Sequence, residues 1–367
     1  MKHWGKRIAK IALGLLICLV LIVGGYVIYM QLNYYRIDDY TQLTVENDHP
    51  DGVSAGTDYT IATYNIGFGA YEPEYTFFMD TGEMKTGEKT QGARARALGE
   101  TNVVTNTNGS IELMMGLDCD FYFVQEVDQS ATRSYHVDQA DMIRSAFNTY
   151  GYVYCSAFHS PYLFYPFNEP HGSVESGIVT MSKYHIQESM RRQLPVSTSF
   201  ITKFTDLDRC FVVNRIPADN GKELVLINLH LSAYDEGGQI RKQQLEMLNG
   251  VMAEEYAKGN YVIAGGDFNH DIAGTIEAFP SEQKVPGWVY ELSDEDLAEG
   301  LSFVVPDNNL EVPSCRGADI PYEKGVDYTV TVDGFIVSDN VEASSEVINN
   351  EFAYSDHQPV KMTFRLK

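Results

Sequence analysis

Hydrophobic residues fall into one long run near the N-terminus and then into many short runs, most of which end beside polar residues. The long run, Ile11 to Met30, carries no charge and is long enough to cross a bilayer as a helix. The short runs have the length of strands, whereas three later segments space their apolar residues as a helix does. These segments are Thr101 to Leu117, Gln139 to Tyr150 and Gly238 to Lys258.

The order of these elements predicts the fold class. Strands alternate with helices, but some strands also follow one another through short turns, as Arg209 to Ile216 and Glu223 to Leu231 do. We therefore predict an α/β fold with mixed sheets and find no internal repeat or second domain boundary. The predicted organisation is a cytoplasmic tail (1–10), a transmembrane signal anchor (11–30), a polar tether (31–57) and one catalytic domain (58–367).

Charges on either side of the long run predict its orientation. Basic residues precede it and mainly acidic ones follow, which places the N-terminus in the cytoplasm by the positive-inside rule. We expect a single-pass protein of the cell membrane with an extracytoplasmic domain. A cleaved signal peptide is the alternative, but the run is long for one and no small-x-small cleavage site follows it. The preceding basic residues are Lys2, Lys6, Arg7 and Lys10.

Composition narrows the class of partner. With 44% hydrophobic and 12% aromatic residues, the chain of 367 residues can bury a substantial core. The formal net charge of −24 repels nucleic acid, which disfavours duplex DNA as a partner and a processive nuclease as a function. The cysteines form no C-x-x-C pair, so neither a zinc site nor a disulfide framework is indicated. We expect Cys119, Cys155 and Cys210 to be small buried thiols.

The most informative short run is Tyr261 to Asn269, YVIAGGDFN. Its apolar half predicts a buried strand, and the two glycines after Ala264 allow the backbone to turn sharply. Asp267 and Asn269 would then lie at the end of the strand, where residues two apart can point the same way. A carboxylate that orients water and an amide that donates to a phosphate oxygen could meet one ligand there. Asp and Asn after Gly-Gly are also common turn formers.

Other predicted strands also border polar side chains suited to phosphate ester hydrolysis. Glu126 and Asp356 supply the hard oxygen ligands that Mg²⁺ prefers. His230 and His357 can donate to phosphate oxygens, and Asp333 can hold the imidazole of His357 and raise its pKa. Each residue alone also fits a turn or a cap. The predicted set is Asn65, Glu126, His230, Asp267, Asn269, Asp333, Asp356 and His357.

Short sequence blocks carry a family resemblance. In chain order they are TYNIG, FVQEVD, SGIVTMSK, LINLHLSAYD, GGDFN, VDGFIVS and SDHQPV. In order and spacing they resemble the endonuclease/exonuclease/phosphatase superfamily, which includes DNase I, exonuclease III, neutral sphingomyelinases and inositol polyphosphate 5-phosphatases. The resemblance covers Tyr59 to Leu366. It implies a four-layered α/β sandwich (DNase I-like) of two packed mixed sheets, preceded here by one transmembrane helix, with the site at one edge.

The resemblance also implies roles for the candidate residues and a divalent cofactor, Mg²⁺ or Mn²⁺. Asp267 would orient the attacking water, Asn269 would contact phosphate, and His230 would contact phosphate or the leaving group. Asp333 and His357 would form a dyad. The residues implied to lie on the metal side are Asn65, Glu126 and Asp356.

Two assignments stay open. Gly334 follows Asp333 where nucleases of the superfamily often carry an aromatic residue, and Asp327 is a second candidate for the carboxylate of the dyad. Many of these nucleases also contact phosphate through a tyrosine in the window between the Glu and Ser-Gly blocks. The candidates in that window are Tyr154, His159, Tyr162 and Tyr165.

The expected activity is hydrolysis of a phosphoric ester by a membrane-anchored, metal-dependent enzyme. The substrate would be a phosphodiester or phosphomonoester, such as a phospholipid headgroup or another small phosphate ester. The block LHLSAYD resembles the sphingomyelinase branch, but so short a match ranks substrates only faintly. A metal-dependent nuclease is the alternative within this chemistry. The alternative of another class is a catalytically inactive surface binding module, which the presence of Glu126 and Asp267 disfavours.

Overall fold

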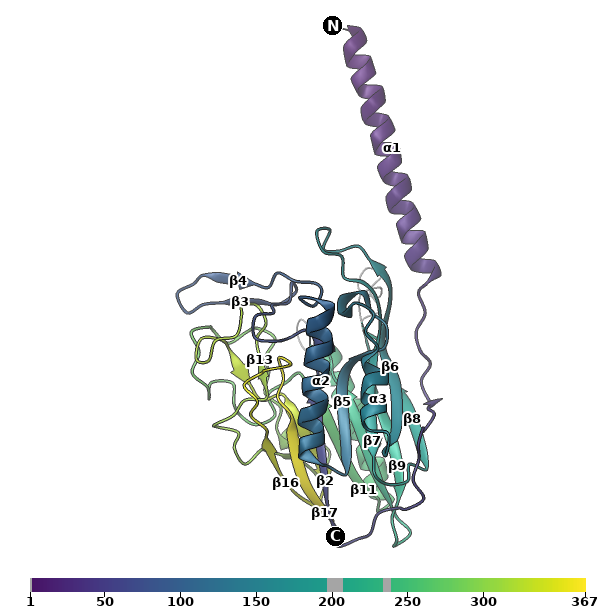
Figure 1. Ribbon diagram of the computed structural model, residues 1–367, viewed down its shortest axis with the longest axis vertical. Helices are drawn as coiled ribbons and strands as arrows, with labels where there is room; N and C mark the ends of the chain where they lie inside the picture. The colour runs from purple at the N-terminus through teal and green to yellow at the C-terminus, as the bar shows by residue number, and fades with distance from the viewer. Residues whose placement is uncertain (1, 197–206, 234–238) are drawn as a thin grey trace.

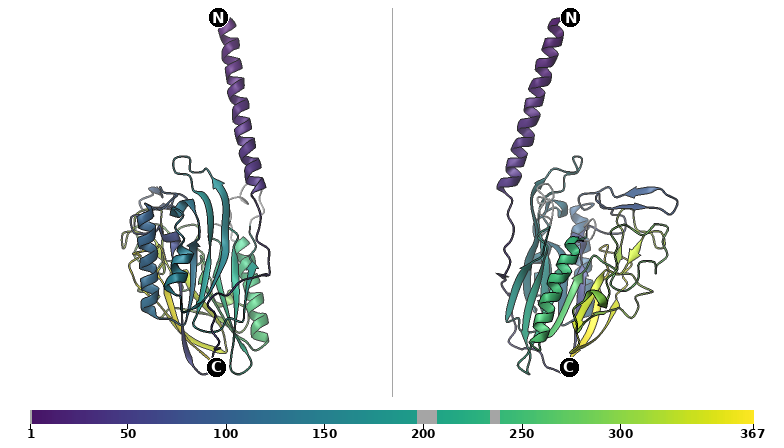
Figure 2. Two further views of the ribbon diagram at one scale, coloured as in Figure 1. Left: turned by 45° about the vertical axis from the view of Figure 1, so that its right-hand side comes forward. Right: turned by 180° about the vertical axis from the view of Figure 1, so that it is seen from behind.

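The computed structural model describes residues 2–196, 207–233 and 239–367. After the N-terminal helix, two mixed β-sheets pack face to face and helices cover their outer faces, as predicted (Figures 1 and 2). The six-stranded sheet has the order β16 (Val341–Val347), β17 (Val360–Leu366), β2 (Asp58–Asn65), β5 (Phe121–Asp128), β7 (Gly172–Ser182), β6 (Gly151–Leu163). The seven-stranded sheet has the order β1 (Thr41–Gln42), β8 (Glu188–Gln193), β9 (Cys210–Pro217), β10 (Glu223–His230), β11 (Tyr261–Asp267), β15 (Asp333–Ser338), β12 (Leu301–Val304).

Both sheets mix parallel and antiparallel neighbours. Strands β2 and β5 are parallel, and so are β10 and β11, whereas the other described pairings in the two sheets are antiparallel. Two small hairpins lie outside the sheets. They pair β3 (Thr81–Glu83) with β4 (Lys89–Gln91), and β13 (Cys315–Arg316) with β14 (Thr329–Val330).

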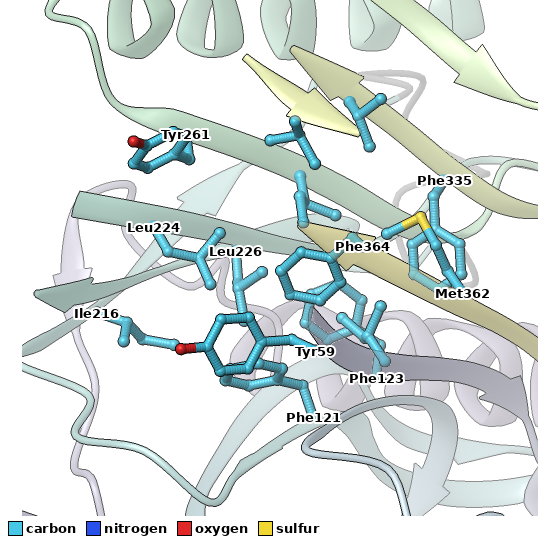
Figure 3. Packing of buried hydrophobic residues seen from close by; sticks show 14 of the residues in the cluster. Tyr59, Phe121, Phe123, Ile216, Leu224, Leu226, Tyr261, Phe335, Met362 and Phe364 are labelled. Atoms are coloured by element: carbon cyan, nitrogen blue, oxygen red, sulfur yellow. The ribbon is translucent and has the colours of Figure 1, made fainter. Parts of the chain in front are cut away.

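The main hydrophobic core lies between the two sheets. Phe123 of the six-stranded sheet packs in one buried cluster with Leu226 and Phe335 of the seven-stranded sheet (Figure 3). All three side chains are fully buried. Removal of such apolar surface from water is the dominant favourable term in folding, so this cluster holds the two sheets together.

Separate clusters attach the outer helices. Ile111 and Ile143 pack on the outer face of the six-stranded sheet, while Leu248 and Met252 pack against Val262 on the other side of the sandwich. The helices that carry these side chains are α2 (Glu100–Leu117), α3 (Gln139–Ala146) and α4 (Gln239–Ala257), all within the three segments predicted to be helical except for the first residue of α2.

Helix α1 (Lys2–Leu32) extends away from the domain (Figure 1). Its segment Trp4–Leu32 has a mean hydropathy of 2.9, and no part of its most apolar window is buried. Among the described residues it is the one helix long and apolar enough to cross a membrane. It contains the predicted anchor and is longer than it at both ends.

The segment between α1 and β2 packs on the domain. Strand β1 pairs with β8, so the chain joins the seven-stranded sheet before the predicted start of the domain. Arg36 forms an ion pair with Asp208 at 3.0 Å, and Arg192 forms one with Asp39 at 3.0 Å. Part of the predicted tether therefore packs on the domain.

The three cysteines predicted to be buried thiols are buried. Cys119, Cys155 and Cys210 are free and buried. The sulfur atoms of Cys155 and Cys210 lie 3.7 Å apart, where β6 of one sheet faces β9 of the other. They thus pack as small apolar side chains between the sheets.

The two glycines before Asp267 act differently from the prediction. Strand β11 continues through them to Asp267, so the chain does not turn sharply at this point. A Cβ on Gly266 would lie 1.9 Å from the carbonyl oxygen of Leu229, and its φ of +147° is one that other residues rarely adopt. A Cβ on Gly265 would lie 2.3 Å from the ring of Phe335. Glycine is required here because the neighbouring strands β10 and β15 approach β11 closely.

This close approach predicts the effect of adding one methyl group. We expect Gly266→Ala to lower the free energy of unfolding by at least about 1–3 kcal/mol, because the new Cβ meets backbone that cannot move aside cheaply. Urea denaturation followed by circular dichroism measures the change. Gly287→Ala is the matched control, since a Cβ there meets nothing within 4 Å. It should stay within about 0.5 kcal/mol of the parent, and equal losses in the two variants would contradict the explanation.

Candidate active site

The topology brings the predicted residues to one edge of the sandwich. Parallel strands end at the same edge of a sheet, so the ends of β2 and β5 lie together, as do those of β10 and β11. Strand β15 is antiparallel to β11, and β17 is antiparallel to β2, so each begins where its partner ends. Asp333 at the start of β15 therefore lies beside Asp267, and the segment before β17 lies beside Asn65.

Asn65 joins the two sheets at this edge. Its side-chain nitrogen lies 3.0 Å from Asp267 Oδ2 and 3.3 Å from Glu126 Oε1, and it lies 3.5 Å from His357 Nε2. The side-chain oxygen accepts a hydrogen bond of 3.0 Å from the amide of Gly67. With its amide held at both ends, buried Asn65 has one orientation at the centre of the group.

Asp267 is the carboxylate with most neighbours in the group. Its Oδ1 accepts a hydrogen bond of 2.8 Å from the amide of Asn269, which has a φ of +52°. Its Oδ2 lies 3.4 Å from His230 Nε2 and 3.7 Å from His357 Nε2. The tight turn from Asp267 to Asn269 keeps Asn269 close to the Asp267 carboxylate. The side chain of Asn269 donates to the carbonyl of Leu231 at 2.9 Å.

His357 is paired with Asp333. The two are joined by a contact of 2.8 Å between His357 Nδ1 and Asp333 Oδ2, and both are buried. The hydroxyl of Ser314 donates to the same carboxylate oxygen at 2.7 Å. That hydroxyl also accepts a hydrogen bond of 3.0 Å from the backbone amide of Asp333. Ser314 therefore links the carboxylate of Asp333 to the backbone of the same residue. The imidazole thereby turns Nε2 toward Asp267.

Glu126 reaches the group through an irregular strand. The register of β5 against β7 shifts between Val124 and Val127, as at a β-bulge, and Glu126 has a φ of +53°. Bulges re-aim side chains, and such backbone strain concentrates at functional sites. The bulge turns the carboxylate of Glu126 toward Asn65.

Asp356 closes the group on the side of β17. Ser355 donates from its hydroxyl to the carbonyl of Asn65 at 2.8 Å and contacts Asp356 Oδ1 at 3.3 Å. A Cβ on Gly67 would lie 3.0 Å from Asp356 Oδ1, and Gly67 has a φ of +52°. Glycine thus lets the backbone after Asn65 pass close to this carboxylate.

Burial shapes the electrostatics of the group. It raises the pKa of Asp267 to about 6 against the opposing effect of the His357 charge, and it raises the pKa of Asp356 to about 6. Burial lowers the pKa of His357, but the charges of Asp333, Cys315, Asp267 and Asp356 together outweigh burial, and they raise that pKa well above its ordinary value. Burial lowers the pKa of His230 well below its ordinary value, with the charges of Arg209 and His357 adding to the effect.

The donor atoms suit a hard divalent cation. Ligating atoms of Asp267, Asp333 and His357 all lie within 4.8 Å of one another, and Glu126 and Asp356 add carboxylates next to them. Oxygen-rich sets of this kind match Mg²⁺ and Mn²⁺ rather than softer metals. This compact trio shares no residue with the predicted metal-side set. Within the trio, His357 Nδ1 is engaged by Asp333. Glu126 and Asp356 stay the predicted metal ligands, and Asp333 Oδ1 has no hydrogen-bond partner among the described residues.

Four side chains were candidates for a contact with phosphate. Three of the four have described partners away from the group. His159 pairs with Asp208 at 2.6 Å, Tyr162 contacts α1, and the ring of Tyr165 packs near that of Phe78. Tyr154 is partly buried on β6, with its ring against Gly177. Among described contacts, none links these side chains to the eight predicted residues.

Two supporting residues were not predicted. Ser314 fixes Asp333, and no pattern in its neighbourhood signals that role. Arg133 binds Asp128 through two hydrogen bonds of 3.1 and 2.8 Å, and its guanidinium lies 3.9 Å from the ring centre of Phe68. This buried ion pair connects the end of β5 to the loop after β2. Arg133 follows Asp128 by five residues, and no sequence pattern indicates that the two form a buried ion pair.

Comparisons with known proteins support the fold. A scan against protein-family models finds no match, and a search of curated proteins finds none. An endonuclease/exonuclease/phosphatase protein from Bacteroides vulgatus is similar in structure with a TM-score of 0.52 and 16% identity, over 85% of this chain and 100% of that one. A protein of the same description from Beutenbergia cavernae gives 0.53 and 14%, over 84% and 72% of the two chains.

A third similar structure is TDP2 from D. rerio in complex with a single-strand DNA product. Its TM-score is 0.51 and its identity 14%, over 84% of this chain and 99% of that one. The structural neighbours are thus endonuclease/exonuclease/phosphatase proteins and TDP2. The predicted resemblance and the predicted DNase I-like sandwich are confirmed as the fold of this chain.

Asp327, the second candidate for the dyad, lies in a turn where its Oδ2 accepts from the amide of Glu323 at 2.7 Å. Burial raises the pKa of Asp327 to about 7. A raised pKa of an acid means that the folded state holds its proton more tightly than the unfolded state. This contribution to stability is present at acidic pH and is lost as pH rises from about 4, where unfolded Asp titrates, through 7.

We therefore expect Asp327→Asn to be more stable than the parent at pH 8 and to lose that advantage at pH 4. Asparagine keeps an acceptor for the Glu323 amide but cannot ionise. Urea denaturation across this pH range gives the difference in the free energy of unfolding. Asp219→Asn, at an exposed residue, is the control and should show no such trend. An advantage of Asp327→Asn that is constant with pH would contradict the explanation.

Proposed function

We propose that the chain is a membrane-anchored, Mg²⁺- or Mn²⁺-dependent phosphoric ester hydrolase that cleaves a phosphodiester or phosphomonoester. The observation that carries the proposal is the convergence of Asn65, Asp267 and His357 from both sheets within hydrogen-bonding or near hydrogen-bonding distance. A fold shared with phosphoesterases and a buried Asp, Asp and His group support it.

The proposed roles follow from the contacts. Asp267 accepts the proton of the attacking water, because its raised pKa of about 6 brings it closer to neutral pH than an ordinary carboxylate. Asn65 keeps Asp267 oriented by donating to it at 3.0 Å. His357, charged and held by Asp333, donates from Nε2 to a phosphate oxygen as negative charge develops there.

The remaining residues bind the substrate and the cation. Glu126 and Asp356 would hold the cation, with Asn65 beside them, and a bound divalent cation would neutralise charge on the phosphate. His230 stays neutral because burial lowers its pKa, so it contacts the phosphate or the leaving group as a neutral donor. The backbone amide of Asn269 donates to Asp267, which keeps this residue at the same edge, and its side-chain amide, which also donates to the Leu231 carbonyl, would contact the phosphate.

The topology of the chain is part of the proposal. α1 serves as an uncleaved signal anchor with the N-terminus in the cytoplasm and the domain outside, because basic residues precede the apolar run. The domain then meets phosphate esters at the outer surface of the cell membrane. An inactive binding module is disfavoured by the presence of each acid and histidine that the chemistry needs.

A nuclease activity is the alternative, and TDP2 from D. rerio is a relative in structure with bound single-strand DNA product. The arginines of this chain do not favour it. Arg94 pairs with Glu169 at 3.3 Å, Arg192 pairs with Asp39 at 3.0 Å, and Arg191 is 1% exposed. With the net charge of −24, these internal pairings leave little basic surface for a phosphate backbone.

The two central carboxylates should fail differently when each is changed to alanine. Glu126→Ala should raise the metal concentration needed for activity and recover in part at high Mg²⁺ or with Mn²⁺, because a ligand is lost. Asp267→Ala should lose on the order of a hundred- to ten-thousand-fold in rate at any metal concentration, since no cation replaces the base. Hydrolysis of bis(p-nitrophenyl) phosphate by the full chain, titrated with metal, measures both.

Controls accompany this experiment. Asn269→Ala should lose roughly a hundred-fold in rate, as expected for one transition-state hydrogen bond in a preorganised site. Glu342→Ala, at an exposed acid near the start of β16, should match the parent. Chelation should abolish activity. Restoration of Asp267→Ala by metal while Glu126→Ala stays inert would exchange the two roles, and activity untouched by chelator would refute the metal dependence.

Duplex DNA should bind the full chain weakly. We expect a dissociation constant above about 10⁻⁴ M at physiological salt, at the weak end of nonspecific binding. Fluorescence anisotropy of a labelled duplex in detergent solution measures it, with a basic DNA-binding protein as the positive control. Tight binding that falls steeply with salt would favour the nuclease alternative.

A further inference from the structure

An exposed aromatic surface lies at the connection between β6 and β7. Phe164 is 50% exposed, Tyr165 is 64% exposed and Phe167 is 85% exposed. We call these three residues the aromatic tip. Exposed neighbouring aromatic side chains are unusual on a monomeric soluble surface and mark interaction sites. The hydrolytic chemistry proposed above makes no use of them.

The aromatic tip lies beside the apolar helix. The hydroxyl of Tyr26 on α1 donates to the carbonyl of Tyr162 at 3.1 Å, and the amide of Tyr162 donates to the hydroxyl of Tyr29 at 3.1 Å. The ring of Phe164 meets that of Tyr26 with centres 5.3 Å apart. Tyr26 precedes the end of α1 at Leu32 by six residues, or about 9 Å along a helix. Phe164 is therefore level with the last turns of a helix that can cross a membrane.

The strand register places the aromatic tip beyond the catalytic edge. Asp128, at the end of β5, pairs with Ser176 on β7, whereas the last pair of β6 and β7 is Leu163 with Gly172. Four residues of strand separate these positions on β7, which is about 13 Å. The connection reaches past the edge that holds Glu126, toward the end of the molecule where α1 arrives (Figures 1 and 2).

The loop that follows Asn65 supports the aromatic tip. Arg96 donates from Nε to the carbonyl of Pro170 at 2.6 Å, and the amide of Ala95 donates to Glu169 at 2.7 Å. The ring of Phe78 packs near Tyr165 with centres 5.8 Å apart. The ion pairs of Arg36 and Arg192 fasten the segment after α1 to the same domain. The aromatic tip, the helix end and the catalytic edge are thus parts of one body.

We propose that the aromatic tip is a membrane-docking surface, which enters the interface of the bilayer that α1 crosses and turns the catalytic edge toward the lipid. Aromatic rings concentrate at membrane interfaces, where one end of the side chain is apolar and the other wet. A bilayer is the occupant that continues from α1, because the contacts with Tyr26 hold Phe164 at that depth. The substrates of the proposed function are then phosphate esters carried at the membrane surface.

A fluorescent label tests the depth of the aromatic tip in the full chain. Cys18→Ser removes the exposed cysteine, and the others are at most 7% exposed, so a label goes to a cysteine placed by Phe167→Cys. Nitrobenzoxadiazole is the label, and phosphatidylcholine vesicles with nitroxide-labelled lipid are the membrane. Glu342→Cys is the control position, because β16 begins near the end of β17 and the start of β2, away from the catalytic edge.

At position 167 we expect blue-shifted emission that nitroxide lipid quenches and aqueous iodide does not. Position 342 should show the reverse, and Phe164→Ser should reduce the lipid quenching at 167. High salt should change nothing, since the aromatic tip carries no charge. Iodide quenching at 167, no difference between the two positions, or loss of lipid quenching in salt would overturn the proposal.

The docking proposal rests on the proposed function for calling the edge catalytic and for α1 as the membrane anchor. The label reports depth without turnover, so its result is independent of the hydrolysis assay. An inserted tip on an inactive protein would refute the proposed function alone. An active protein whose label at 167 stays in water would refute the docking alone.

Discussion

The packing of the two sheets face to face is the interaction on which the site depends. Phe123, Leu226 and Phe335 fill the space between the sheets and set how their edges meet. Neither sheet holds a complete set of polar residues, because Asp267 belongs to one and Asn65 to the other. The hydrogen bond between them, at 3.0 Å, exists only because the core holds the strand ends in place. Protein interiors are close-packed, so a small change in this core would displace the edge.

Much of this arrangement could be predicted from the sequence. Short apolar runs that end in polar residues locate β2, β10 and β11, and the family resemblance supplies the order in which they assemble. The eight candidate residues fall at strand boundaries for that reason. Asp333 and His357 illustrate the gain from the structure, because the sequence left Asp327 as an alternative and the 2.8 Å contact selects Asp333 as the partner.

What the sequence could not predict depends on contacts between distant segments. The bulge that turns Glu126 inward occurs in the pairing of β5 with β7. The pattern of apolar residues alone predicts a regular strand there. Ser314 acts through Asp333, which follows it by many residues, and its own neighbourhood is ordinary. The glycines before Asp267 predicted a turn, whereas glycine is needed there because Leu229 and Phe335 on neighbouring strands leave no room for a Cβ. Tertiary contact overrides local preference at each of these places.

The segment after α1 has a mechanical consequence. A free linker spanning residues 31–57 would let a domain wander within roughly 30 Å of its anchor and turn in any direction. Here Arg36, Arg192 and β1 bind that segment to the domain surface. With α1 anchored in a membrane as proposed, α1 and the domain would diffuse as a single particle with one preferred orientation, and encounters with a membrane-borne substrate would become a search in two dimensions.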